Sequence, residues 1–147
     1  MIKKNHHGDT EHTKKAKFRE EEHPSMRINF LTLAIFAPIL IIIGVTGFLI
    51  PPALSLTSGA APYNLFHIFS GLVGLAIVVS QNEGGASFFN VGFGLIDLYQ
   101  ALAGYFHLPP EKYFLWTRAD DILHLLIGAA LVIIGCYGIL KRERRTS

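Results

Sequence analysis

Two histidines in apolar surroundings are the residues of this sequence that are best suited to chemistry. His67 and His124 each stand in the unit Asn/Asp-x-x-His-x-x-x-Gly, which occurs at residues 64–71 and again at residues 121–128. Positions i, i+3 and i+7 of a helix lie on one face, so each histidine shares a face with an Asn or Asp and a glycine. Imidazoles at matched depth on two helices can ligate a haem iron or a metal ion, and they also form hydrogen bonds between helices.

These histidines belong to an expected polar layer near the outer membrane surface. Its members are Asn64, His67, Gln100, Asp121 and His124, with Tyr63 and Tyr105 nearby. Three interpretations are open. In the first, the Asn and Asp cap their helices and the histidines bond neighbouring helices. In the second, the layer binds a small ligand, a lipid headgroup or an ion, and in the third His67 and His124 hold a haem b or a metal ion.

Asp97 is an acidic residue in the middle of an apolar stretch. Placing an aspartate at the centre of a membrane costs at least about 2.5 kcal/mol, so this residue needs a role. It either serves a proton, a cation or another ligand, or it locks helices together as a protonated or hydrogen-bonded side chain paired with Gln100 or a tyrosine. The helical rise places Asp97 ~10 Å deeper than the histidines, which argues against a simple cluster of the three residues.

The composition indicates a membrane protein. Half of the residues are hydrophobic and only 16% are charged, against about 25% in an average soluble domain. Between residues 28 and 110 the only charged residues are Glu83 and Asp97. A chain of this size cannot bury so much uncharged sequence in a soluble core, which excludes a soluble globular enzyme. The same hydrophobicity excludes an intrinsically disordered chain.

Four apolar stretches must position the polar residues. They cover residues 28–50, 63–79, 86–106 and 122–140, and each has the length of a helix that crosses the hydrocarbon core. Lipid offers no partner for backbone polar groups, so each stretch must be helical. The sequence therefore predicts an all-α fold, a four-helix transmembrane bundle at residues 28–140.

The placement of Lys and Arg predicts the topology. The tail 1–27 carries seven of these residues and the tail 141–147 carries four, whereas the connections between the apolar stretches carry two in total. Basic residues accumulate on the cytoplasmic side, so both tails are expected to be cytoplasmic, as four crossings permit. Residues 1–27 have too little apolar surface to fold alone and are expected to be mobile.

The two halves of the membrane domain are alike. We call the shift along the chain that carries His67 onto His124 the repeat offset. The same shift carries Gly47 onto Gly104 and Gly71 onto Gly128. This pattern predicts two similar helical hairpins related by a pseudo-twofold axis along the membrane normal, a parallel internal repeat. Small residues allow helices to approach closely in lipid, so we expect helix contacts at Gly71, Gly74, Gly104, Gly128 and Gly135.

The segments NLFHIFSGLVGL and DDILHLLIGAAL, with GVTGFLIPP before the first, resemble the DUF4383 family of small bacterial four-helix membrane proteins. The resemblance extends over about residues 28–140 and leaves out both tails. In the family pattern a further histidine often precedes the asparagine, where this chain has Tyr63. The resemblance implies the four-helix architecture and the bacterial cytoplasmic (inner) membrane. It implies no activity, because the family has none established.

No catalytic motif is present: the sequence lacks HExxH, a phosphate-binding glycine loop and a CxxC pair, and its single cysteine, Cys136, lies in an apolar run. We therefore expect a membrane protein without enzymatic activity or cofactor, which binds a protein partner, a lipid or a small ligand through the polar layer. Its expected partners are the lipid bilayer and a membrane protein or a second copy of the chain, and not nucleic acid. The alternatives are a haem- or metal-binding redox protein using His67 and His124, and an ion or proton carrier using Asp97.

Overall fold

The computed structural model describes residues 24–51 and 54–146, which form five helices and no strand. The all-α class is thereby confirmed for this part of the chain. Four helices are long: α2 (Pro24–Leu49), α3 (Ala61–Val79), α4 (Glu83–Phe106) and α6 (Arg118–Thr146). The fifth, α5 (Glu111–Phe114), is a single turn in the connection between α4 and α6.

The long helices extend beyond the apolar stretches that predicted them. α2 begins at Pro24 rather than at residue 28, and α6 begins at Arg118 and continues to Thr146, through the segment expected to be a basic tail. Lys, Arg and Glu favour helix about as well as Leu does, so a helix need not end where its apolar sequence ends. α2 continues past Pro38 and stops just before Pro51 and Pro52, two consecutive prolines, the first of which disfavours the helical conformation of the residue before it. Of the expected N-terminal tail, residues 1–23 lie outside the described residues.

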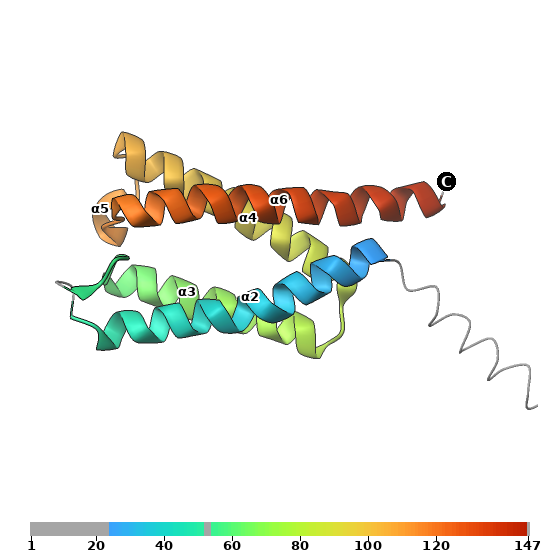
Figure 1. Cartoon of the computed structure of the whole chain (residues 1–147), viewed down its shortest axis with the longest axis horizontal. Helices are drawn as coiled ribbons and strands as arrows, with labels where there is room; N and C mark the ends of the chain where they lie inside the picture. The colour runs from blue at the N-terminus through green and yellow to red at the C-terminus, as the bar shows by residue number, and fades with distance from the viewer. Residues whose placement is uncertain (1–23, 52–53, 147) are drawn as a thin grey trace, which may run out of the picture.

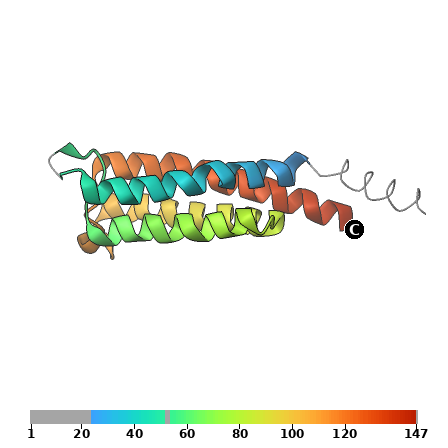
Figure 2. The same cartoon turned by 90° about the horizontal axis from the view of Figure 1, so that it is seen from below.

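The four long helices run side by side along the long axis of the molecule (Figures 1 and 2). α2 packs mainly against α3, and α4 packs mainly against α6; we call these the first and the second helix pair. α2 also contacts both helices of the second pair, and α3 contacts α4. Within the described residues no Cα atom of α3 lies within 8 Å of one of α6. The space between α3 and α6 is therefore spanned by side chains alone.

Three of the described helices are long and apolar enough to cross a membrane, at Arg27–Leu49, Ala61–Val79 and Arg118–Lys141. These helices indicate an integral membrane protein. α4 has the required length, but its composition is less apolar because it carries Asn90, Asp97 and Gln100. The fourth crossing predicted at 86–106 is therefore not established by composition.

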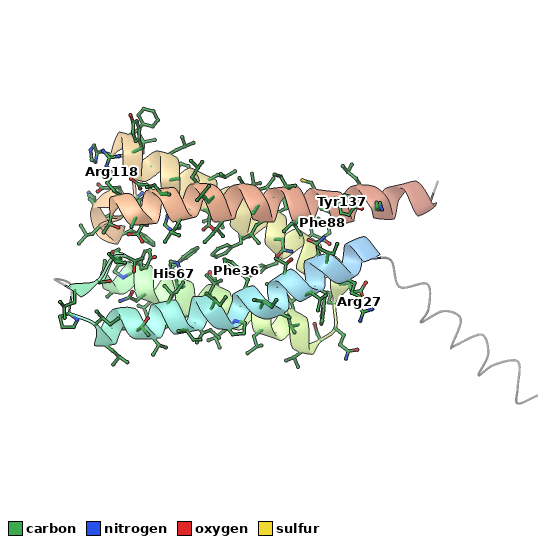
Figure 3. All side chains as sticks on the ribbon, in the orientation of Figure 1. Arg27, Phe36, His67, Phe88, Arg118 and Tyr137 are labelled. Atoms are coloured by element: carbon green, nitrogen blue, oxygen red, sulfur yellow. The ribbon has the colours of Figure 1, made fainter. Side chains whose placement is uncertain are left out.

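Aromatic rings fill the middle of the molecule between the two helix pairs. The Phe93 ring of α4 meets Phe36 of α2 edge to face and stacks on Phe66 of α3, with ring centroids 5.5 and 5.9 Å apart. Leu40 and Leu131 are buried in the same cluster. Figure 3 shows Phe36 and His67 pointing into the space between the pairs, with His67 nearer the end where α5 lies.

Glycines bring the two helices of each pair into backbone contact. A Cβ atom added at Gly71 would lie 2.7 Å from the carbonyl oxygen of Ala37, and one added at Gly128 would lie 2.7 Å from the carbonyl oxygen of Gly94. The repeat offset carries the first of these contacts onto the second. The other glycines expected at helix contacts also lie against a neighbouring helix: Gly74, Gly104 and Gly135.

Replacement of Gly128 by alanine is expected to destabilise the protein. The added Cβ would lie 2.7 Å from the Gly94 oxygen and 2.9 Å from the Cβ of Asp97, so α4 and α6 would have to move apart. Overpacking of this kind costs about 1–3 kcal/mol, which exceeds the gain in helix propensity. Thermal unfolding in detergent should give a lower Tm for Gly128→Ala. Gly92→Ala is the matched control, because a Cβ there meets nothing within 4 Å, and an equal loss in both variants would contradict this packing.

Candidate functional site

Four side chains span the gap between α3 and α6 at the end where α5 lies. The Tyr63 hydroxyl donates a hydrogen bond to Asp120 Oδ1 at 2.9 Å. One turn further in, the rings of His67 and His124 face each other, with centroids 6.4 Å apart and planes inclined by 22°. The structure therefore brings together the two histidines that the sequence places at matched depth. Tyr63 and Asp120, which meet beside them, are also separated by the repeat offset.

Asp120 makes most of the polar contacts here, although it was not among the predicted site residues. Its buried carboxylate accepts hydrogen bonds from Ser58 N (2.9 Å), Thr117 N (2.8 Å) and Thr117 Oγ1 (2.9 Å), besides the one from Tyr63. Thr117 Oγ1 in turn accepts a bond from Asp120 N at 3.2 Å, which forms a capping box at the start of α6. The pattern Thr-x-x-Asp before an apolar run is the sequence signal that could have identified this residue.

Hydrogen bonding and packing fix the orientation of the histidine pair. His67 Nδ1–H donates to the carbonyl oxygen of Tyr63 at 2.9 Å, and because a carbonyl can only accept, Nε2 keeps its lone pair in the neutral ring. The Tyr63 ring lies 4.1 Å from the His67 ring and 6.2 Å from the His124 ring, centroid to centroid. Trp116, from the loop between α5 and α6, packs edge-on against His124 at 6.2 Å. Aromatic rings thus enclose both imidazoles.

Gln100 of α4 lies at the same depth as the histidines. Ala103 lies on the same face of α4 as Gln100 and packs in a cluster with Tyr63. Tyr63 is one turn outward of His67 on α3. Gln100 is one turn inward of Ala103, so it is level with His67. We call the group formed by His67, Gln100, Trp116 and His124 the interior polar site; Trp116 is included for its ring contact with His124, and Gln100 for its level on α4.

Several polar atoms of the interior polar site have no hydrogen-bond partner within residues 24–51 and 54–146. They are Gln100 Oε1, Trp116 Nε1 and His124 Nδ1. His67, Gln100 and His124 are only 5, 5 and 4% exposed, so neither a lipid headgroup nor a partner protein reaches them from outside. A buried polar atom that lacks a partner costs about 1–3 kcal/mol, so these three atoms are energetically unfavourable as they stand.

Asp97 lies inward of the interior polar site. A Cβ at Gly128, one turn inward of His124, would lie 2.9 Å from the Asp97 Cβ, which places Asp97 one helical turn (~6 Å) deeper than His124. This is less than the difference in depth that helix lengths alone suggested. The Asp97 side chain is buried, and among the described residues it forms no hydrogen bond with Gln100 or a tyrosine.

The other two members of the predicted layer, Asn64 and Asp121, contact their own helix pair instead. Asn64 Oδ1 lies against Gly47, and Asp121 Oδ1 lies against Gly104, where any Cβ would collide with it. Close approach of a glycine Cα to an oxygen is the geometry of a weak Cα–H···O contact. Asn64 Nδ2 also donates to the carbonyl oxygen of Gly59 at 3.3 Å. The predicted layer is therefore divided between the interior polar site and these two contacts.

A second polar cluster, which the sequence pattern did not reveal, lies at the opposite end of the helices. Asn90 Nδ2 of α4 donates to Asn29 Oδ1 of α2 at 2.8 Å, and Asn29 Nδ2 donates to the carbonyl oxygen of Ile134 of α6 at 2.9 Å. Both asparagines are fully buried. This chain of amide hydrogen bonds links three helices, and Asn90 Oδ1 within it has no partner among the described residues.

The packing around the histidine pair does not suit a haem. A porphyrin between two axial imidazoles needs a flat cavity, whereas the Tyr63 ring packs on both histidines and Trp116 packs on His124. In the part of the chain that the structure describes, no group of three or more His, Cys, Asp or Glu side chains is placed to hold a metal ion.

Comparison with known proteins identifies one family whose model matches this chain. The model of a family described as "Domain of unknown function (DUF4383)" matches residues 52–137, which is more than half of the chain. This range includes both histidines, Asp97 and the Asp120 capping box. Neither a curated protein nor a solved structure matches the chain.

Asp120→Ala is expected to destabilise the protein by about 3 kcal/mol or more, because it leaves the Tyr63 hydroxyl and the backbone N–H groups of Ser58 and Thr117 without their acceptor. Unfolding in detergent measures the loss. The adjacent Asp121→Ala is the control, since Asp121 Oδ1 accepts no hydrogen bond in the described structure. Equal destabilisation by the two variants would contradict the role assigned to Asp120.

Proposed function

The chain belongs to the DUF4383 family, and we propose that it is a four-helix integral protein of the bacterial inner membrane that binds a small polar ligand in the interior polar site. The observation that carries this proposal is the set of buried polar atoms on Gln100, Trp116 and His124 that have no partner within the described residues. In this proposal the protein binds its ligand without enzymatic activity of its own.

The distribution of polar residues on α4 supports a fourth crossing. Asn90, Asp97 and Gln100 are buried against the other helices, where lipid does not meet them. The exposed positions of α4 carry large apolar side chains, among them Phe88, Leu95 and Leu102. With four crossings, the basic residues before α2 and at the end of α6 lie on one side, which the positive-inside rule assigns to the cytoplasm.

Contacts between corresponding residues support the proposed internal repeat. Three pairs of residues separated by the repeat offset meet across the space between the two helix pairs: Phe36 with Phe93, Tyr63 with Asp120, and His67 with His124. Equivalent residues meet in this way only close to a twofold axis. A parallel repeat of two hairpins along the membrane normal explains all three contacts.

The chemistry of the unpartnered atoms describes the ligand. Trp116 Nε1–H can only donate a hydrogen bond, and Gln100 Oε1 can only accept one. His124 Nδ1 does either, according to its tautomer. The ligand therefore needs both donor and acceptor groups, and it must be small because aromatic rings enclose the site.

Two alternatives have weaker support. A haem or metal bound by His67 and His124 would require Tyr63 and Trp116 to move away from the imidazoles. An ion or proton carrier that uses Asp97 would require a path through the apolar cluster around Leu40, which lies next to it in the middle of the molecule.

Protein extracted in a mild detergent is expected to carry a small bound molecule, detected as additional mass by native mass spectrometry. Gln100→Leu should lose this mass by removing the acceptor, while its Tm in the empty state stays equal or rises, because an apolar side chain replaces an unpartnered buried amide. Gly92→Ala on the same helix is the control and should retain the mass.

Two outcomes would contradict the ligand proposal. The first is that native mass spectrometry of the wild-type protein shows no additional bound mass, even when the protein is extracted with native membrane lipid around it. The other is a Soret band or stoichiometric metal that disappears in His67→Ala and His124→Ala, which would establish the redox alternative instead.

The topology is tested with reporter fusions in bacterial cells. Alkaline phosphatase is active outside the cytoplasm and green fluorescent protein is fluorescent inside it. Fusions after residue 23 and after Ser147 should both be fluorescent, and phosphatase inserted in the connection after α2 should be active. Termini on opposite sides would show three crossings, with α4 outside the membrane, and would contradict the proposed arrangement.

A further inference from the structure

A groove on the outer surface of the second helix pair is separate from the interior polar site. It has a volume of about 350 Å³ and lies between the last turns of α4 and the first turns of α6. Tyr105, Arg118 and Asp121 line its outer end, and Leu102, Ile122 and Leu125 contribute apolar walls. Figure 3 places Arg118 at the end of the molecule opposite to Arg27. The groove surface is therefore almost entirely apolar, with Arg118 and Asp121 at its outer end.

The corresponding positions of the first helix pair, one repeat offset earlier in the chain, lack these charges. The apolar positions hold similar residues, with Val45, Leu65 and Ile68 in place of Leu102, Ile122 and Leu125. The polar positions differ, with Phe48, Ala61 and Asn64 in place of Tyr105, Arg118 and Asp121. The first pair packs through the same glycine contacts without a cation or a carboxylate there. Helix packing therefore does not require the two charges of the groove.

The two charged groups are neighbours without being tightly paired. Arg118 Nη1 lies 3.8 Å from Asp121 Oδ2, which is longer than a hydrogen bond; the Arg118 side chain is 75% exposed and the Asp121 side chain 14%. The guanidinium also lies over the Tyr105 ring, 5.4 Å from its centroid. A guanidinium suits a phosphate, and a carboxylate suits an ammonium group, so this rim complements a headgroup that carries both charges.

We propose that the groove binds a phospholipid with a phosphoethanolamine headgroup from the outer leaflet. Arg118 donates hydrogen bonds to the phosphate, and Asp121 Oδ2 accepts one from the primary ammonium group. A quaternary ammonium has no N–H to donate, which favours ethanolamine over choline. One acyl chain lies along Leu102, Ile122 and Leu125. This inference rests on the membrane topology proposed above and is independent of the interior ligand.

Lipid retention tests this assignment. The full chain is reconstituted in vesicles of equal parts phosphatidylethanolamine and phosphatidylglycerol, extracted in mild detergent and examined by native mass spectrometry. Wild-type protein should retain phosphatidylethanolamine about tenfold over phosphatidylglycerol, the factor that one charge-assisted hydrogen bond supplies. Arg118→Ala introduces the residue that the first helix pair has at the corresponding position, Ala61, and this variant should lose the retained lipid. Asp121→Asn should keep a lipid but lose the preference.

Lys112→Ala is the matched control, because it removes one positive charge from the connection at the same end of the molecule, outside the groove. It should behave like the wild type, and circular dichroism should show that each variant is folded. Retention of the two lipids in their bilayer ratio, a preference for phosphatidylglycerol, or an equal loss in Lys112→Ala would each overturn the proposal. Gln100→Leu should retain the lipid, so a failure of the interior ligand proposal is distinguishable from a failure of this one.

Discussion

The separation of α3 from α6 is the constraint on which the rest of the structure depends. Within each helix pair, glycines such as Gly71 and Gly128 allow backbone contact, whereas no described Cα of α3 comes within 8 Å of α6. Long side chains must therefore close the gap. The Tyr63–Asp120 hydrogen bond and the facing imidazoles do so at the end where α5 lies.

The same separation explains why polar atoms are left without partners. In the middle of the molecule the gap is filled by aromatic rings, whose packing needs no hydrogen bonds. Toward α5 it is filled by side chains that have polar edges, and Asp120 satisfies the outermost of them. At the next level inward, Gln100 Oε1 and His124 Nδ1 have no hydrogen-bond partner within the described residues. The polar atoms without partners therefore lie between two parts of the gap: the end near α5, where Asp120 supplies hydrogen bonds, and the middle, where apolar rings need none.

The sequence was sufficient to predict the helices and to place the two histidines at matched depth, because both follow from periodicity and from the repeat offset. It was not sufficient to choose between Asp120 and Asp121. The repeat pointed to Asp121, which corresponds to Asn64, whereas the contacts of Asp120 come from Ser58 in a distant loop and from Tyr63 on another helix. Contacts of this kind depend on how the two pairs dock, and no local pattern encodes the docking. The helix ends were missed because charged residues continue a helix beyond the lipid.

Comparison of the two helix pairs also separates residues that serve packing from residues that serve a site. Asp97 and Gln100 correspond to Leu40 and Ile43 of the first pair, and both of these apolar residues pack in hydrophobic clusters. Apolar side chains can thus fill these positions in a hairpin of the same design. If α4 crosses the membrane as proposed, an aspartate in their place carries an insertion cost of at least about 2.5 kcal/mol, and a buried glutamine oxygen without a partner adds to it. A bound polar molecule would offset that cost, whereas a purely structural role would favour the residues that the first pair already has.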